Sequence, residues 1–281
     1  MSGTGEYDNN NDLHDRMSEL ASSAVSSQGN INVELQDQTS EIIDLLVTQK
    51  LDDLTILVNT NVDEKTANIE TTGVTPAVGN YVCFKEGTAF YQGRIQNVTP
   101  IAGNQYTIGL DSLLDYPFTT SGGCALTSPD MNVDGSVTPV VFRVSPALLE
   151  AGTRWDITRM MLTITDSSAM DDGKFGGAPP LNNGVIVRVK YNGTRKNIFT
   201  VRENGEFRLR AYDVSYLDAT LGPAGLESMG VRRSFNGQDK NGVAIRLVND
   251  DDPDEFQIIV QDDLTVLDSF RVVVQGHIVA D

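Results

Sequence analysis

The stretch VGNYVCFKEGTAFYQGRIQNV, residues 78–98, predicts two β-strands joined by a tight turn at residues 85–87. Along the second strand the residues alternate, because polar side chains separate Tyr91, Gly93 and Ile95 on one face. The stretch holds no histidine, no phosphate-binding loop and no pair of carboxylates. It therefore predicts a hairpin with a structural role and without catalytic residues.

Similar short strands surround this hairpin. Residues 66–71, 106–110 and 123–126 are strand candidates, and glycine-containing turns separate them. Helical segments of 10–15 residues, which a doubly wound parallel sheet would need, do not intervene. The spacing predicts a small β-barrel or sandwich module over residues 66–130.

The rest of the chain repeats this pattern on a larger scale. Dense stretches rich in β-branched residues, such as VIVRVKYN and FRVVVQGHIV, are typical of a sandwich core. We expect residues 131–281 to form a larger, jelly-roll-like antiparallel β-sandwich, so the fold class is mostly β. The expected strands are 137–144, 155–166, 184–191, 197–201, 207–212, 243–248, 255–261 and 269–279.

Residues 1–65 read as an N-terminal assembly arm with short helices. Apolar residues at helical spacing predict two amphipathic helices, one around residues 13–24 and one after a cap at Thr39 or Ser40. Between them, residues 31–35 alternate as in a short strand, and residues 54–58 either continue the second helix or form a strand. Short helices of this kind are marginal alone, so their apolar faces should either fold back on the chain's own core or be buried against another chain, and we favour the second. The predicted interface residues are Leu13, Met17, Leu20, Ile42, Leu45 and Leu46.

Charge limits the partners. The chain of 281 residues has a formal net charge of -18 and a pI near 4.4. Binding to nucleic acid requires a basic face, and an anionic membrane would repel this chain, so neither partner is expected. The first twenty residues lack the basic start and apolar stretch of a secretion signal, which predicts synthesis in the cytoplasm.

The sequence offers little for catalysis. NDDDPDE, residues 249–255, is the densest acidic run, and Asp250, Asp252 and Asp254 are weak calcium candidates. The glycine of an EF-hand loop is missing, so a solvated hairpin turn is the preferred interpretation, and contact with a basic partner is a third. His14 and His277 fit surface or neutral roles better than a general base. Cys83 and Cys124 are expected to be buried thiols. We predict no enzyme, no catalytic residue and no cofactor.

One segment adds a resemblance. TANIETTGVTPAVGNYVCFKEGTAFYQGRIQNVTPIAGNQYTIGLDSLLDYPFTTSGGC resembles a β-module of tailed-bacteriophage virion proteins, through its VG-x-Y/F turn, its FYQGRI-like strand and LDSLLDYPF. DQTSEIIDLLVTQKLDDLTILVNT and FRVVVQGHIVA resemble such proteins more weakly. The resemblance implies a homo-oligomeric subunit of a collar, head-to-tail junction, tail or baseplate. Its partners would be itself and other virion proteins, within a virion assembled in the host cytoplasm.

Two other functions remain open at this point. A carbohydrate-binding, receptor-recognition module of a fibre or adhesin would use the long loop at residues 167–184 and exposed tyrosines. A glycan-cleaving depolymerase would need two carboxylates facing each other across a sugar site.

Overall fold

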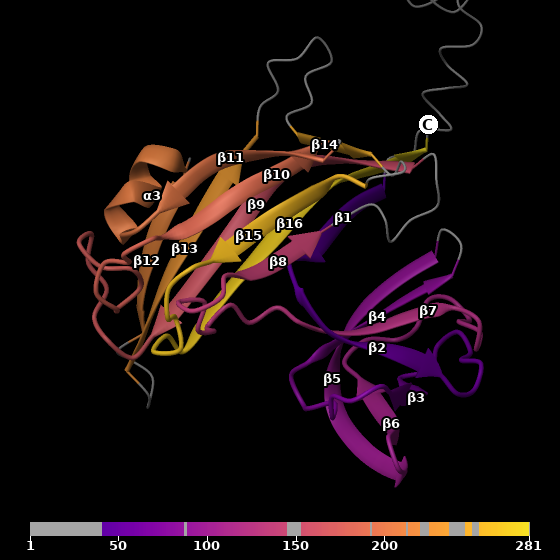
Figure 1. Cartoon of the computed structure of the whole chain (residues 1–281). Coiled ribbons are helices and arrows are strands. Elements are labelled where there is room, and N and C mark those ends of the chain that lie inside the picture. The colour runs from indigo at the N-terminus through magenta and orange to yellow at the C-terminus, as the bar shows by residue number, and fades with distance from the viewer. Residues whose placement is uncertain are drawn as a thin grey trace, which may run out of the picture. The chain divides into compact units, whose positions relative to one another are not determined.

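A computed structural model describes residues 41–86, 89–144, 153–191, 193–211, 213–219, 225–235, 245–248 and 253–280. Within them the chain is built almost entirely from antiparallel β-strands, with one short helix, α3 (Asn204–Arg210) (Figure 1). The strands form a closed barrel and two open sheets. The expectation of a mostly β chain is confirmed.

Six strands close the barrel, in the order β2-β3-β6-β5-β4-β7. The hairpin predicted at residues 78–98 is present, with Glu86 opposite Ala89 at its turn. Because side chains alternate along a strand, every second residue enters the barrel, as the burial pattern of β3 shows. The strands are β2 (Gln49–Ile56), β3 (Thr66–Thr71), β4 (Tyr81–Glu86), β5 (Ala89–Ala102), β6 (Gln105–Leu110) and β7 (Gly123–Ser128).

Aromatic rings fill one part of the barrel core. The ring of Phe84 lies 5.9 Å from Tyr91 and 5.4 Å from Phe118, between ring centroids. Gly93 makes this packing possible, since a Cβ there would overlap the Tyr91 ring. The Tyr91 hydroxyl then reaches the carbonyl oxygen of Ser112, 3.2 Å away. The small residue between Tyr91 and Ile95 therefore positions an aromatic side chain.

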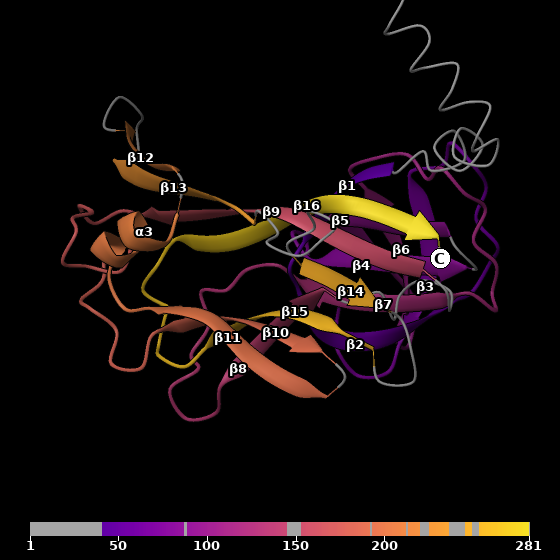
Figure 2. The same cartoon turned by 90° about the horizontal axis from the view of Figure 1, so that it is seen from above.

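The two open sheets face each other as layers of a sandwich (Figure 2). The six-stranded sheet runs β1-β16-β9-β13-β12, with β14 beside β9, and the four-stranded sheet runs β11-β10-β15-β8. Buried residues of both sheets form one apolar core. The strands are β1 (Glu41–Leu46), β8 (Val140–Val144), β9 (Thr153–Asp166), β10 (Val185–Tyr191), β11 (Thr194–Val201), β12 (Asp213–Ala219), β13 (Leu226–Ser234), β14 (Ile245–Val248), β15 (Glu255–Val260) and β16 (Ser269–Ala280).

The first described strand corrects the predicted domain order. Residues 41–46 are not a helix but β1, which lies at the edge of the six-stranded sheet beside β16. The chain then crosses into the barrel at β2 and returns to the sandwich at β8. The barrel is thus inserted between two strands of the sandwich, and it begins before residue 66. The helix predicted around residues 13–24 and the strand at 31–35 lie outside the described residues.

The segment after β11 also differs from expectation. Residues 207–212 were predicted as a strand, but residues 204–210 form α3, where Phe207 is buried and Leu209 is 83% exposed. Glu206 lies in the first turn, and Arg208 and Arg210 lie in the last, an arrangement that suits the helix dipole. The hairpin of β12 and β13 was not predicted at all.

Candidate functional site

The long loop between β9 and β10 is hydrogen-bonded to the segment that follows β15 in the sandwich. Asp262, only 7% exposed, lies just after β15. Its carboxylate accepts hydrogen bonds from the backbone N–H groups of Asn182 at 3.2 Å, Asn183 at 3.1 Å and Gly184 at 2.7 Å. Gly184 has a φ of 87°, a backbone conformation that favours glycine. One carboxylate therefore sets the end of this loop.

A second buried side chain holds the middle of the same loop. Asn204, at the start of α3, has 0% exposure. Its Oδ1 accepts a hydrogen bond from the Gly176 N–H at 2.8 Å, while its Nδ2 donates to the carbonyl oxygens of Asp171 at 2.8 Å and Gly176 at 2.9 Å. This loop was considered for ligand contact, but these polar groups form hydrogen bonds within the chain.

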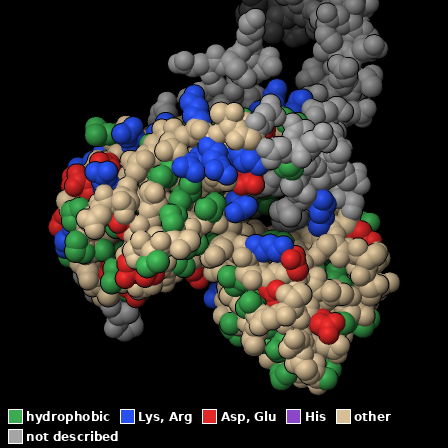
Figure 3. All heavy atoms as spheres, viewed as in Figure 1, with side chains coloured by type: hydrophobic (Ala, Val, Ile, Leu, Met, Phe, Trp, Pro, Cys, Tyr) green, Lys and Arg blue, Asp and Glu red, His purple; other side chains and the backbone are tan. Residues whose placement is uncertain are grey.

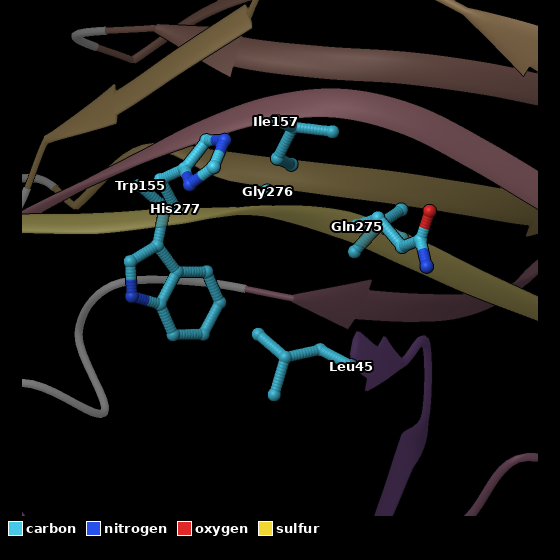
Figure 4. Close-up of a pocket in the computed structure, with 7 residues that line it drawn as sticks. Leu45, Trp155, Ile157, Gln275, Gly276 and His277 are labelled. Atoms are coloured by element: carbon cyan, nitrogen blue, oxygen red, sulfur yellow. The ribbon is translucent and has the colours of Figure 1, made fainter. Parts of the chain in front are cut away.

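A small cavity lies where β1 meets β9 and β16 (Figure 4). The Trp155 indole and the Leu45 side chain lie on one side of β16, and the His277 imidazole lies on the other. Trp155 Nε1 and His277 Nδ1 are buried and have no hydrogen-bond partner among the described residues. The space is about 10 Å³, which holds roughly one water molecule. The lining residues are Leu45, Trp155, Ile157, Val274, Gln275, Gly276 and His277.

Chemistry at this cavity is limited by its lining. Its walls are largely apolar, and the residues that line it include neither a carboxylate nor a thiol. The cavity therefore suits the packing of β1 against the sheet, not the binding and conversion of a substrate.

A wider, polar groove opens on the barrel beside β2 and β3. It measures about 190 Å³ and is lined mainly by amide, hydroxyl and carboxylate side chains. Several of these groups already have partners: Asn59 accepts from the Thr120 N–H at 3.0 Å, and Asn61 donates to Glu64 at 2.8 Å. The lining residues are Val58, Asn59, Thr60, Asn61, Glu64, Thr66, Ala67 and Asn68.

The structure describes one of the three predicted calcium candidates, Asp254. This residue is 5% exposed, and its carboxylate accepts a hydrogen bond from the Val248 N–H at 3.0 Å. Its own N–H donates to the carbonyl oxygen of Val248 at 3.1 Å, so Asp254 joins the end of β14 to the start of β15. Asp250 and Asp252 lie outside the described residues. Across the part of the chain that the structure describes, no three His, Cys, Asp or Glu side chains cluster closely enough to hold a metal ion.

The predicted interface residues divide into two groups. Leu13, Met17 and Leu20 lie outside the described residues. Ile42, Leu45 and Leu46 belong to β1, so their expected place on a helical arm is wrong. Leu45 is 7% exposed within the sandwich core of its own chain, and its role as an interface residue is therefore corrected. Leu46 is half-buried, and its backbone N–H donates to Gln92 Oε1 of the barrel at 3.2 Å.

Both cysteines are buried and unpaired, as predicted. Burial raises the pKa of Cys83 to about 11, although weak hydrogen bonds from Thr127 and Gln92 oppose that shift. Burial also raises the pKa of Cys124. Because the thiolate is the reactive form, neither side chain is suited to act as a nucleophile near neutral pH.

Asp262 and Asn204 organise the long loop, and the sequence interpretation did not single out either. Asp262 stands in an ordinary QDD turn, and its partners are about 80 residues distant in the chain. In the sequence, Asn204 followed by Gly205 is a pattern typical of a turn. No local signal identifies such anchors.

Comparisons with known proteins add no relative. No family model, no curated protein and no solved structure matches this chain. Among the described residues, no helix is long and apolar enough to span a membrane.

Proposed function

We propose that this protein is a structural subunit of a tailed-bacteriophage particle. It forms a homo-oligomeric component of the collar, head-to-tail junction, tail or baseplate, and it acts as a shape-supplying part, not as an enzyme. Its partners are other copies of itself and other virion proteins. The observation that carries the proposal is the topology, in which a closed barrel is inserted into a two-layered sandwich.

The strand order supports a jelly roll for the sandwich. If β1, β8, β9, β10, β11, β14, β15 and β16 are numbered one to eight, the six-stranded sheet contains the order 1-8-3-6 and the four-stranded sheet the order 2-7-4-5. This is the arrangement of an eight-stranded jelly roll, an architecture common in viral capsid and lectin domains. The hairpin of β12 and β13 is then an addition beside the sixth strand. Fold alone does not assign function, so the phage assignment also rests on the sequence resemblance.

The internal use of polar groups supports a structural role. Asp262, Asn204 and Asp52 each satisfy several backbone groups of a neighbouring loop, which makes the loops rigid without leaving a reactive group. The backbone N–H of Leu46 donates to the Gln92 side chain of the barrel, and Thr48, between β1 and β2, exchanges backbone hydrogen bonds with Arg143 of β8. Well-anchored loops suit a subunit that makes the same contacts repeatedly in a particle.

Native mass spectrometry and analytical ultracentrifugation of the full chain test the proposal. We expect a closed oligomer, alone or with virion partners. A variant lacking residues 1–40 should keep the barrel and the sandwich folded, because β1 starts at Glu41. It should fail to enter particles, because it lacks the segment proposed to contact a neighbouring copy. A monomer at every concentration, with and without virion partners, would overturn the proposal.

A carbohydrate-binding module is the second candidate, and the polar groove beside β2 and β3 favours it. Amide and hydroxyl groups such as those of Asn61 and Thr66 suit sugar hydroxyls. A glycan array with and without calcium separates the two candidates. Specific glycan binding that Asn61→Ala and Asn68→Ala abolish would favour this second function.

A further inference from the structure

We propose that the outer side of the four-stranded sheet is a docking surface for the acidic N-terminal segment, residues 1–40, of a neighbouring copy. The surface, called here the basic face, consists of Arg143, Arg188, Lys190 and Arg195. The inference rests on the proposed function, since it needs an assembled particle, and it adds the surface through which neighbouring copies recognise each other.

Strand register places these cations in two rows. Val187, Val189 and Phe256 belong to the sandwich core, so the residues that alternate with them point outward. One outward row runs Arg143, Gln257, Arg188 and Asn197 across the four strands. The next row runs Glu255, Lys190 and Arg195. Lys196 pairs with the core-facing Val189, so it points to the other side of the sheet and is not part of the basic face.

The charge of this surface is opposite to that of the whole chain. Residues 185–201, which form β10, β11 and their turn, contain four basic residues and no acidic one, whereas the chain carries a net charge of -18. Figure 3 shows Lys and Arg side chains gathered on this side of the sandwich. Glu255 is the one acid in the two described rows, and its carboxylate lies 3.6 Å from Arg143.

On this side of the sheet, the charged side chains are accessible to a partner and the aliphatic side chains are not. Ile186 and Ile259 share the next outward row, but they are only 8% and 4% exposed. The Arg143 side chain is 53% exposed, and Arg195 is also exposed. The surface therefore offers positive charge above a closed aliphatic floor, which suits an acidic segment and favours recognition through electrostatic attraction.

The chain itself contains such a segment. Residues 1–40 hold seven acidic residues and one arginine, so their formal charge is 1 − 7 = −6. Leu13, Met17 and Leu20 stand among these acids, where Asp12, Asp15 and Glu19 flank them. A segment of this length can span up to about 130 Å when extended, which is enough to reach a neighbouring copy.

Isotope-resolved cross-linking of the full chain identifies the occupant. Equal amounts of unlabelled and ¹⁵N-labelled protein are mixed, assembled and treated with a zero-length carbodiimide, which joins lysine to carboxylate. We expect peptides that join Lys190 to residues 1–40 and that pair one label with the other. Lys65, an exposed lysine of the barrel, serves as the control and should give no such link.

A charge exchange tests the same contact by association. In Arg143→Glu/Arg195→Glu, the association constant should fall roughly tenfold, because two exposed ion pairs become repulsive. Mixing this variant with a second one, Asp12→Lys/Asp15→Lys/Glu19→Lys, should restore association through opposite charges. The matched control is Lys65→Glu/Arg94→Glu on the barrel, which changes the net charge equally and should not weaken association.

Other occupants give distinct results. Links from Lys190 only to Asp250–Asp252 within one label would identify the chain's own acidic run and overturn the proposal. Retention of a short DNA duplex by the wild type, lost in Arg143→Glu/Arg195→Glu, would identify nucleic acid and overturn it too. If the wild type assembles but neither the cross-links nor the charge reversal supports docking, this proposal fails while the structural role stands. If the wild type never assembles, the proposed function fails first.

Discussion

The carboxylate of Asp262 and the backbone N–H of Gly184 lie 2.7 Å apart, although 77 residues separate them in the chain. Asn182 and Asn183 also donate backbone N–H groups to the same carboxylate. Because Asp262 is 7% exposed, solvent replaces this contact poorly. A single acidic side chain thus determines where the long loop ends and β10 begins.

Replacing this anchor should destabilise the sandwich. In Asp262→Ala, several buried N–H groups lose their acceptor, so the free energy of unfolding should fall by about 2–4 kcal/mol. Urea unfolding followed by circular dichroism measures the change. Asp263→Ala is the matched control, because that neighbouring carboxylate is exposed and bonds only to Thr265 among the contacts described. Equal losses in the two variants would contradict the anchoring role.

The sequence predicted the strands that alternate clearly and whose partners share a continuous core. β9, β10, β15 and β16 are rich in β-branched residues, and their expected ranges agree with the structure within a few residues. The barrel hairpin at residues 78–98 was predicted because its turn and alternation are local signals.

Where the predicted secondary structure was wrong, tertiary contacts outweighed the local sequence pattern. The spacing of Ile42, Leu45 and Leu46 fits a helix, yet pairing with β16 makes this segment a strand. Phe207 and Leu209 alternate as in a strand, but α3 buries the first and exposes the second. The anchors Asp262 and Asn204 depend on distant backbone groups, which no local pattern reveals. The groove beside β2 and β3 was missed for the same reason.

Leu45 should contribute to the stability of its own chain. It packs in the sandwich core at 7% exposure, so Leu45→Ala should lower the free energy of unfolding by about 2–4 kcal/mol. The loss should be equal over a tenfold range of protein concentration, since the contacts lie within one chain. Leu209→Ala, at an 83% exposed position, is the control and should change stability by no more than about 0.5 kcal/mol. A loss at Leu45 that varies with concentration would instead indicate burial between copies.

Asp52 should make the stability of the barrel depend on acid pH. Its carboxylate accepts hydrogen bonds from the Thr72 hydroxyl and from the backbone N–H groups of Thr72, Gly73 and Val74. These bonds hold the pKa of Asp52 well below its usual value of 3.8, with the Thr72 hydroxyl as the largest cause. Below that value the unfolded chain binds a proton that the folded chain does not, so the stabilisation is present above it and is lost as pH falls further.

Denaturant unfolding from neutral pH down to about pH 2 tests this linkage. Asp52→Asn should be less stable than the wild type at neutral pH, and the difference should shrink as pH drops below about 4. Asp53→Asn is the control, because the Asp53 side chain is 71% exposed and pairs with Lys50 at the surface. Its difference from the wild type should stay small throughout. A gap between Asp52→Asn and the wild type that stays constant with pH would contradict the assignment.

The two thiols should be nearly inert in the folded protein. Burial raises the pKa of Cys83 from 9.0 to about 11, which lowers its thiolate fraction near pH 8 roughly a hundredfold, and Cys124 shifts in the same direction. Labelling with a chromogenic disulfide reagent should therefore be slow in native buffer and complete for both thiols in urea. Ser167→Cys adds an exposed thiol to the same molecule as an internal control, and we expect one fast thiol and two slow ones. Rapid native labelling of three thiols would show that the barrel opens around Cys83 and Cys124, which is incompatible with a rigid structural module.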